Sequence, residues 1–292
     1  MGDRSDVGLL GSSSLVGQCV IPLLVQAGRG VIAYSRSPVH REPEAGVTWR
    51  QVDGHGLSQA ANTTIRDWLC VAPIWVLPEH FTMLAASGAR RVVALSSTSR
   101  FTKDDSSDSE EQAIALRLVD AESRVQGWAA SHGVEWVILR PTLIYGLGRD
   151  KNIVEIARFV RRFGFFPLFG KANGLRQPIH AADVAGACLA ALQAPCAANR
   201  AYNISGGETL PYRDMVGHIF TALGCRPRLL TVPLWAFHLA VSVLRRLPRY
   251  RQWSAAMAER MNRDLVFDHA EAARDLGFKP GAFVLEAGDL PA

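Results

Sequence analysis

The sequence predicts an α/β fold in which helices cover both faces of an open, doubly wound parallel sheet, with a smaller and mostly helical unit toward the C-terminal end. Three observations carry this prediction. Short apolar runs alternate with helical stretches from residue 7 to residue 139. The runs are apolar almost without interruption, as expected for parallel strands that are covered on both faces. The first run ends in a turn rich in glycine and serine that leads directly into an apolar helix.

The composition narrows the class of protein. Of the 292 residues, 48% are hydrophobic and 20% are charged, which fits a soluble globular protein with a large core. The formal net charge is +5 and the basic residues are scattered, so we expect no nucleic-acid partner. The five cysteines form no C-x-x-C pair, which predicts reduced cysteines and no metal site. The first six residues lack a signal-peptide hydrophobic region, which predicts a cytoplasmic protein.

The first unit of the pattern is strand, turn, helix and strand. We expect strands at residues 7–10 and 31–34, and a helix at residues 15–27 that Gly28 ends. Parallel strands joined in this way need a right-handed crossover. The amides of such a turn and helix start converge on one point and favour an anion. The residues expected at this anion-binding turn are Gly11, Ser12, Ser13, Ser14, Leu15, Val16 and Gly17.

One position in the turn departs from a regular G-x-x-G-x-x-G spacing. Gly11 and Gly17 fill the first and third glycine positions, and Ser14 fills the middle one. We expect Ser14 to offer its amide and its hydroxyl to a bound pyrophosphate, while its side chain narrows the approach.

The later elements continue the alternation. We expect further strands at residues 47–53, 68–73, 91–95, 134–139 and 201–205, and helices at residues 81–87, 113–131 and 181–193. Residues 103–111 are acidic and rich in serine, which is typical of a solvated loop. The aromatic segment 159–170 is more typical of a pocket lining than of a sheet. Beyond residue 205 we expect only helices and turns, with a buried helix in the apolar stretch 229–244.

If the turn binds a dinucleotide, the residue that follows the second strand bears on whether that dinucleotide is NAD or NADP. A carboxylate at this place would accept a hydrogen bond from a free ribose 2′-hydroxyl, whereas an arginine suits a 2′-phosphate. Here the strand ends in Tyr34, Ser35 and Arg36. Arg36 therefore favours NADP over NAD, and the alternative is that it is a solvated loop charge.

Several ordered segments resemble the extended short-chain dehydrogenase/reductases, the NAD-dependent epimerase/dehydratase family. Residues 140–146 are similar to the family's R-P-x-x-x-Y-G, and residues 176–185 to its R-D-F-I-H-V-D-D-V-A. Residues 202–207 and 272–280 match later landmarks. The resemblance implies a Rossmann-type doubly wound parallel sheet with a smaller, mostly helical C-terminal substrate domain. The implied dinucleotide-binding domain is 1–145 plus about 176–205, and the substrate-binding domain is about 146–175 plus 206–292.

The resemblance also implies which residues contact the cofactor. The turn residues would lie over the pyrophosphate and Arg36 would meet the ribose phosphate. The remaining cofactor contacts implied are Asp53 at the adenine amino group, Ala72 and Pro73 beside the nicotinamide-side ribose, and Pro141 and Thr142 against the nicotinamide.

Four further residues are candidates for catalysis or substrate binding. Thr98 falls at the family's catalytic Ser/Thr position, where it would orient a carbonyl. Arg176 matches an arginine that relatives use on a substrate pyrophosphate, and the alternative is a structural arginine tying the two domains together. Tyr145 is a candidate proton donor that more often packs. His180 is a candidate substrate contact that is more often a hydrogen-bonded structural histidine.

The family's Y-x-x-x-K pair is missing from the expected helix. If Glu122 matches the glutamate four residues past the family's lysine, Ile114 stands for the tyrosine and Leu118 for the lysine. Loss of a positioned acid/base costs about 10²–10⁴-fold in rate, so a standard epimerase mechanism is not expected. A second departure is Leu143, where sugar-nucleotide enzymes of the family often carry an asparagine.

Two functions remain open at this stage. The chain is an atypical NADP-dependent oxidoreductase acting on a small or lipid-linked substrate, or it is a non-catalytic protein of the same fold that binds the cofactor in a structural or redox-sensing role. The family often forms dimers, so a homodimer is an expectation. The stretch 229–253 combines apolar residues with an arginine-rich aromatic end, which suits peripheral membrane contact. Packing within the substrate domain is the favoured alternative.

Overall fold

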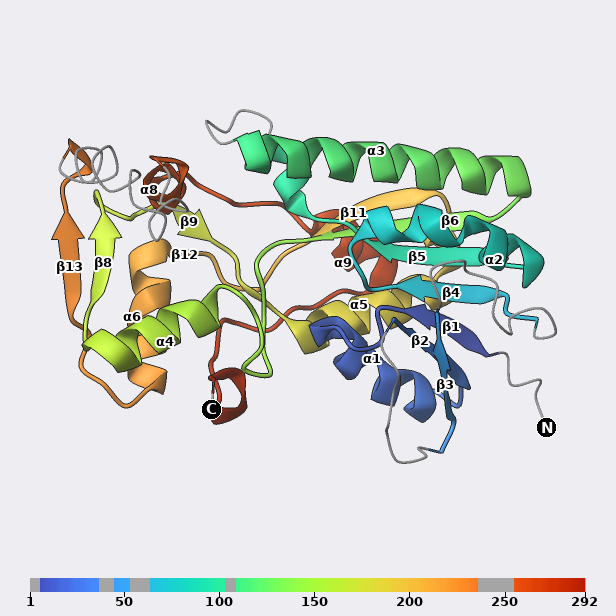
Figure 1. Cartoon of the computed structure of the whole chain (residues 1–292), viewed down its shortest axis with the longest axis horizontal. Coiled ribbons are helices and arrows are strands. Elements are labelled where there is room, and N and C mark those ends of the chain that lie inside the picture. Colours follow the sequence, from blue (N-terminus) through green and yellow to red (C-terminus); the bar gives the residue numbers. More distant parts are fainter. Residues whose placement is uncertain (1–5, 37–44, 53–63, 103–108, 236–254, 292) are drawn as a thin grey trace.

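A central parallel sheet organises the molecule (Figure 1). The computed structural model describes residues 6–36, 45–52, 64–102, 109–235 and 255–291. The sheet has seven strands in the order β11-β6-β5-β4-β1-β2-β3, and every neighbouring pair is parallel. The strands are β1 (Val7–Leu10), β2 (Val31–Ser35), β3 (Val47–Gln51), β4 (Asp67–Cys70), β5 (Arg91–Leu95), β6 (Glu135–Pro141) and β11 (Arg200–Ile204). This arrangement confirms the predicted fold class.

Helices cover both faces of the sheet, as Figure 1 shows. On one face lie α1 (Leu15–Gln26) and α5 (Ala181–Gln193), which share a core cluster with the strands. On the other lie the 3₁₀ helix η2 (Ile74–His80), α2 (Phe81–Ala86) and α3 (Ser109–His132). Successive strand residues alternate between the two clusters, so that Leu9 packs toward α1 and Leu10 toward the opposite face. The continuous apolar runs in the sequence follow from this double coverage.

A second group of elements has its own hydrophobic core. Its helices are α4 (Ile153–Phe163), α6 (Tyr212–Ala222) and α8 (Ala255–Asn262), and its main strands are β8 (Phe166–Phe169) and β13 (Leu229–Val232), which pair in parallel. Two short pairs lie along the connections, β7 (Ile144–Tyr145) with β10 (Ile179–His180) and β9 (Leu175–Arg176) with β12 (Leu210–Pro211). The remaining elements are η3 (Thr98–Phe101), η4 (Pro195–Ala197), α9 (Ala270–Leu276) and η6 (Ala287–Asp289). We propose that the two groups are the two domains predicted from the sequence.

Two expectations for the second half are wrong. The stretch 229–244 does not begin as a buried helix, because Leu229–Val232 forms strand β13. A helix running through Pro233 would lose a backbone hydrogen bond there, and the edge of β8 offers backbone partners instead. Strands β12 and β13 also contradict the expectation of helices and turns alone after residue 205. Residues 236–244, and residues 236–253 of the segment considered for membrane contact, lie outside the described residues.

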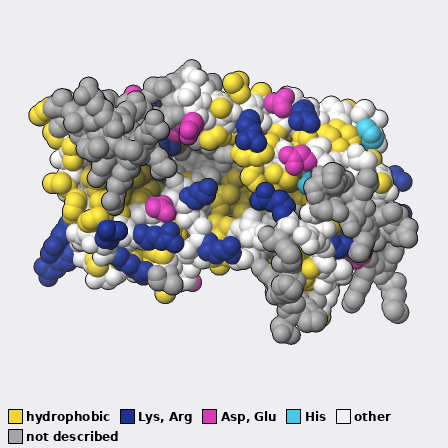
Figure 2. Space-filling model, in the orientation of Figure 1, with side chains coloured by type: hydrophobic (Ala, Val, Ile, Leu, Met, Phe, Trp, Pro, Cys, Tyr) yellow, Lys and Arg dark blue, Asp and Glu magenta, His cyan; other side chains and the backbone are white. Residues whose placement is uncertain are grey.

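The face drawn in Figure 2 carries both apolar and basic side chains. Figure 2 shows hydrophobic side chains toward the centre of this face, with Lys and Arg side chains spread around them. Within the described ranges, no helix combines the length and the apolar character that crossing a membrane requires.

Candidate functional site: a glycine turn and an adjoining cavity

The turn between β1 and α1 is built on two close backbone approaches. Gly11 has φ +85°, and a Cβ there would lie 2.4 Å from the amide nitrogen of Ala72. A Cβ on Gly17 would lie 2.4 Å from the carbonyl oxygen of Gly11. Both contacts are with backbone, which cannot move aside as a flexible side chain could. These two positions therefore require glycine, whatever the turn binds.

The serines hold the turn from within. Ser12 is buried, and its hydroxyl donates to the carbonyl of Tyr34 at 2.7 Å. Ser14 is the N-cap of α1, where its Oγ accepts from the amide of Gly17 at 3.0 Å and donates to the carbonyl of Val71 at 3.3 Å. The Ser14 amide donates to the carbonyl of Gly11 at 2.9 Å.

The Ser14 amide is thus bonded within the turn, and its hydroxyl is bonded to Gly17 and to Val71 after β4, so the expected contacts of Ser14 with a pyrophosphate stay a prediction. The first amides of a helix have no partner within it. With Gly17 capped by Ser14, the amides of Leu15 and Val16 are the first-turn donors that a ligand can use. They carry the positive end of the α1 dipole.

The turn lies where the order in which strands are added to the sheet reverses. Strand β1 pairs with β2 on one side and with β4 on the other, and the later strands add beyond β4. In open α/β sheets, ligands bind at the carboxyl ends of the strands at such a switch point. Gly11 at the end of β1 and Ala72 just after β4 meet at this place.

Of the other predicted cofactor residues, most lie near the same edge of the sheet. Arg36 is exposed directly after β2, and its carbonyl accepts from Gln51 Nε2 at 3.3 Å. Pro73 is the exposed N-cap of η2. Pro141 ends β6 and Thr142 follows it, with the Thr142 amide donating to the carbonyl of Ile204 at 3.0 Å. Asp53 lies outside the described residues.

Thr98 begins η3 just after β5, and its hydroxyl proton is used in a hydrogen bond. Its hydroxyl donates to the carbonyl of Pro141 at 3.2 Å, so it presents lone pairs rather than a free proton. The η3 turn that carries it is tied to α3 through Glu122, which accepts from Ser96 Oγ at 2.5 Å and forms ion pairs with Arg100 and Arg140.

Helix α3 presents apolar side chains where an acid/base pair would stand. Leu118 is 3% exposed and belongs to the core cluster between α3 and the sheet, and Ile114 packs half-buried against that cluster. The helix sequence contains no tyrosine and no lysine. At positions 114 and 118 this helix therefore offers neither a tyrosine hydroxyl nor a lysine ammonium.

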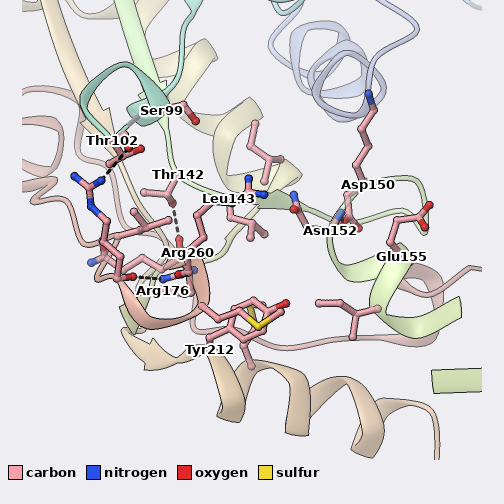
Figure 3. A pocket seen from close by; sticks show the side chains of 18 of the residues that line it. Ser99, Thr102, Thr142, Leu143, Asp150, Asn152, Glu155, Arg176, Tyr212 and Arg260 are labelled. Carbon is pink, nitrogen blue, oxygen red and sulfur yellow. Dashed lines mark hydrogen bonds between the residues drawn. The ribbon is translucent and has the colours of Figure 1, made fainter. Parts of the chain in front are cut away.

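A cavity of about 950 Å³ adjoins this edge (Figure 3). On the sheet side it is lined by Leu15, Thr98 and Thr142, so it reaches the start of α1. On the other side the second group contributes an aromatic and thioether wall, Phe159, Phe166, Phe169, Met215, Met261 and Phe267. The cavity thus lies between the turn and the core of the second group.

Arg176 lines this cavity, but its guanidinium is largely occupied. The side chain is 4% exposed and donates to the carbonyls of Leu175 at 2.7 Å and Arg263 at 2.8 Å, and also to that of Arg260. It lies over the ring of Tyr212, with Cζ 5.5 Å from the ring centroid. Burial lowers the pKa of Arg176 to about 10. These bonds tie β9 to the end of α8, as in the structural alternative.

Tyr145 and His180 lie outside the cavity lining. The Tyr145 hydroxyl donates to the carbonyl of Val284 at 3.0 Å, and burial raises its pKa to about 12. His180 caps α5, accepting at Nδ1 from the amide of Ala182 at 3.1 Å, with Nε2 3.2 Å from Asp289 Oδ1. Both side chains tie the strand pair β7–β10 to the C-terminal segment. Their proposed roles toward a substrate gain no support from this placement.

Three comparisons with known proteins bear on this geometry. Residues 81–205 match the model of the NAD dependent epimerase/dehydratase family. This match covers less than half of the chain, and over that segment it supports the resemblance to the family. UDP-glucose 4-epimerase of Vibrio cholerae is 24% identical over 178 residues, which cover 61% of this chain and 52% of that protein. Subunit 9 of the mitochondrial NADH dehydrogenase 1 alpha subcomplex of Arabidopsis thaliana is 27% identical over 100 residues, which cover 34% of this chain and 25% of the subunit. The chain thus spans about half, or less, of the length of these curated relatives.

Solved structures share the fold across nearly the whole chain. MoeE5 in complex with UDP-glucuronic acid and NAD superposes with a TM-score of 0.71 at 19% identity, covering 98% of this chain and 96% of MoeE5. UDP-glucose 4-epimerase of Thermotoga maritima with UDP-glucose gives 0.70 at 14% identity, covering 94% and 93%. At this level of identity the likeness concerns the epimerase/dehydratase fold alone.

Several cavity residues could not be identified from the sequence. Tyr212 begins α6 and looks like an ordinary first-turn residue, and Arg260 lies on a helix far away in the chain. Arg260 pairs with Glu111 of α3 at 2.5 Å. Such residues meet only through the packing of α6, α8 and α3, so their spacing in the sequence could not have identified them.

Proposed function

We propose that this chain binds a nicotinamide adenine dinucleotide at the β1–α1 turn and is an atypical NADP-dependent oxidoreductase. One observation carries the proposal. Gly11 and Gly17 make backbone approaches that leave no room for a Cβ, at the point where the sheet order reverses between β1 and β4. Both the close approach and the position are those of a dinucleotide turn.

The residues present fit such a group. The amides of Leu15 and Val16 would receive the pyrophosphate, and Arg36 would meet a ribose 2′-phosphate from the end of β2. Pro141 and Thr142 would flank the nicotinamide side, where the cavity begins. When bound, a nicotinamide supplies or accepts a hydride.

The chain's own contribution to chemistry would be unusual. Thr98 presents lone pairs and no free proton, and α3 offers Ile114 and Leu118 in place of an acid and a cation. The protein would therefore bind and orient a substrate beside the nicotinamide, and the proton that the reduced carbonyl oxygen requires would come from water. Such a reaction is slower than one with a positioned donor by about 10²–10⁴-fold.

The packing of Leu118 favours a second candidate, a cofactor-binding protein without turnover. A residue in this core position stabilises the sheet–helix contact and has no route to a ligand. A structural or redox-sensing role needs only the turn.

Fluorescence titration of the full chain with NADPH and NADH tests the binding. We expect NADPH to bind more tightly, and Arg36→Ala to weaken NADPH by about tenfold with little effect on NADH. Arg213→Ala, at an exposed site on α6, is the matched control. Absence of binding by the folded protein to both dinucleotides would overturn the proposal. Consumption of NADPH absorbance with a carbonyl panel then separates the oxidoreductase from the non-catalytic protein.

A further inference from the structure

The cavity beside the turn differs in chemistry from a site for a phosphorylated sugar. Its lining contains the cations Arg149, Lys151, Arg176, Arg260 and Arg263, and the carboxylates Glu111, Asp150, Glu155 and Glu259. Five cations against four carboxylates leave little net positive charge to attract a pyrophosphate. Sites that bind phosphate use charge-assisted hydrogen bonds from cations that have donors to spare.

The cations nearest the second group are already bonded to groups of the protein. The three carbonyls of Leu175, Arg260 and Arg263 occupy Arg176. Arg260 pairs with Glu111 at 2.5 Å, and Arg263 donates to the carbonyl of Thr102 at 3.2 Å. A pyrophosphate here would compete with these existing bonds, of which those of Arg176 are part-buried.

The wall facing these cations is apolar. Phe166, Phe169 and Met261 are buried in the core of the second group, and they present their remaining surface to the cavity. Leu143, on the loop after β6, adds an aliphatic side chain to the same lining. Aromatic rings and thioether sulfur atoms pack favourably against apolar and aromatic groups.

Tyr212 is the polar exception in this wall. Its hydroxyl points into the cavity (Figure 3), and among the described residues it has no hydrogen-bond partner. Burial raises its pKa to about 12, against the opposing effect of Arg176 and Arg260, so it is a neutral donor at physiological pH. A neutral hydroxyl in an apolar wall is suited to bind one ligand oxygen.

We propose that this cavity binds an apolar carbonyl compound, whose hydrocarbon or aromatic body lies against the Phe/Met wall and whose oxygen accepts a hydrogen bond from Tyr212. The role of this ligand as a substrate rests on the proposed function, because only a bound nicotinamide could reduce the carbonyl. The binding itself does not depend on it.

Benzophenone and diphenylmethane form a matched probe pair, because they differ by the carbonyl oxygen. Calorimetry on the full chain should give about fivefold tighter binding of benzophenone, the effect of one hydrogen bond. Tyr212→Phe should abolish this difference while leaving diphenylmethane unchanged. Tyr145→Phe, which removes a tyrosine hydroxyl outside the cavity, should preserve the difference.

Photolysis of bound benzophenone locates the site, because the excited ketone inserts into nearby C–H bonds. We expect peptides labelled at Met215 or Met261. Labelling elsewhere, equal binding of the two probes to the parent protein, or preferential binding of UDP-glucose would each overturn the proposal. If benzophenone binds as expected and neither dinucleotide binds, the proposed function fails and the cavity assignment stands.

Discussion

Glu122 of α3 and Arg140 of β6 form a two-pronged ion pair beneath the turn that carries Thr98. Arg140 Nε lies 3.1 Å from Oε1 and its terminal nitrogen 2.7 Å from Oε2. The carboxylate side chain is 2% exposed, and Arg100 of η3 pairs with it from the other side. The pair therefore ties α3, β6 and η3 together at the edge of the sheet.

Glu122→Gln should destabilise the protein strongly. Removal of the buried carboxylate leaves two guanidinium groups close together without their counter-charge, which costs about 3–5 kcal/mol. Urea unfolding measures the loss. Glu155→Gln is the control, because Glu155 forms an exposed pair with Arg158 and its loss should stay below about 1 kcal/mol. Similar losses for the two variants would contradict the role given to Glu122.

Gly17→Ala should weaken NADPH binding by at least about tenfold, because the new Cβ would push the start of α1 away from the Gly11 carbonyl. Stability should fall as well. Gly127→Ala in α3 is the matched control, since no atom lies within 4 Å of its added Cβ, and it should be neutral or stabilise the helix by up to about 1 kcal/mol. Unaltered NADPH affinity in Gly17→Ala would remove the turn from the binding site.

The sheet and its helices could be predicted because their periodicity is local. Helix α5 has the predicted bounds, residues 181–193, and the strands fall within a few residues of their predicted positions. The stretch 229–244 could not be assigned from hydrophobicity alone. Its first residues are strand because β8 supplies a pairing edge, and that edge lies far away in the sequence.

The glycine turn was predictable for the same local reason, whereas the side-chain partners of the candidate site were not. Tyr145 donates to Val284, 139 residues away, and Arg176 donates to Arg260, 84 residues away. Whether a polar side chain is free for a substrate depends on these distant acceptors. The sequence motifs single out Arg176 and His180 but carry no information about which groups bond to their side chains.

Leu118→Lys should not restore an acid/base site. The position is closed by the core between α3 and the sheet, so a lysine there would be desolvated and would cost several kcal/mol, about 3 or more. Leu116→Lys, at a position 69% exposed on the same helix, should change stability by less than about 0.5 kcal/mol. Thermal and urea unfolding compare the two.

The same variant has a predicted pH dependence. Burial lowers the pKa of an introduced lysine, so the unfolded chain binds more protons and the stability of Leu118→Lys rises with pH. A variant as stable as the parent, with no such slope, would show that position 118 is open to solvent or to a ligand. In that case packing would not explain why this chain has leucine where the family has lysine.

Asp150 should make a pH-dependent contribution of opposite sign. Its Oδ1 accepts from the amides of Asn152 and Ile153 at the start of α4, while Oδ2 is buried and, in the described part of the chain, has no partner. Burial raises the pKa of Asp150 above its ordinary value of 3.8, and the hydrogen bonds from the amides oppose this only in part. The stability that the Asp150 carboxyl contributes is therefore fully present below pH 3.8. It is lost as the pH rises through the raised pKa.

Two substitutions separate the charge of Asp150 from its hydrogen bonds. Asp150→Asn keeps an acceptor oxygen and removes the titration, so relative to this variant the parent should gain stability as pH falls toward 3.8. Asp150→Ala also lacks the titration and in addition loses the acceptor, so it should be less stable than Asp150→Asn by about 1 kcal/mol at every pH. Asp120→Asn, which affects an exposed pair with Arg124, is the control and should show neither effect. A parent that instead loses stability relative to Asp150→Asn on acidification would mean that the amides outweigh burial, and that the carboxylate is held charged at the mouth of the cavity.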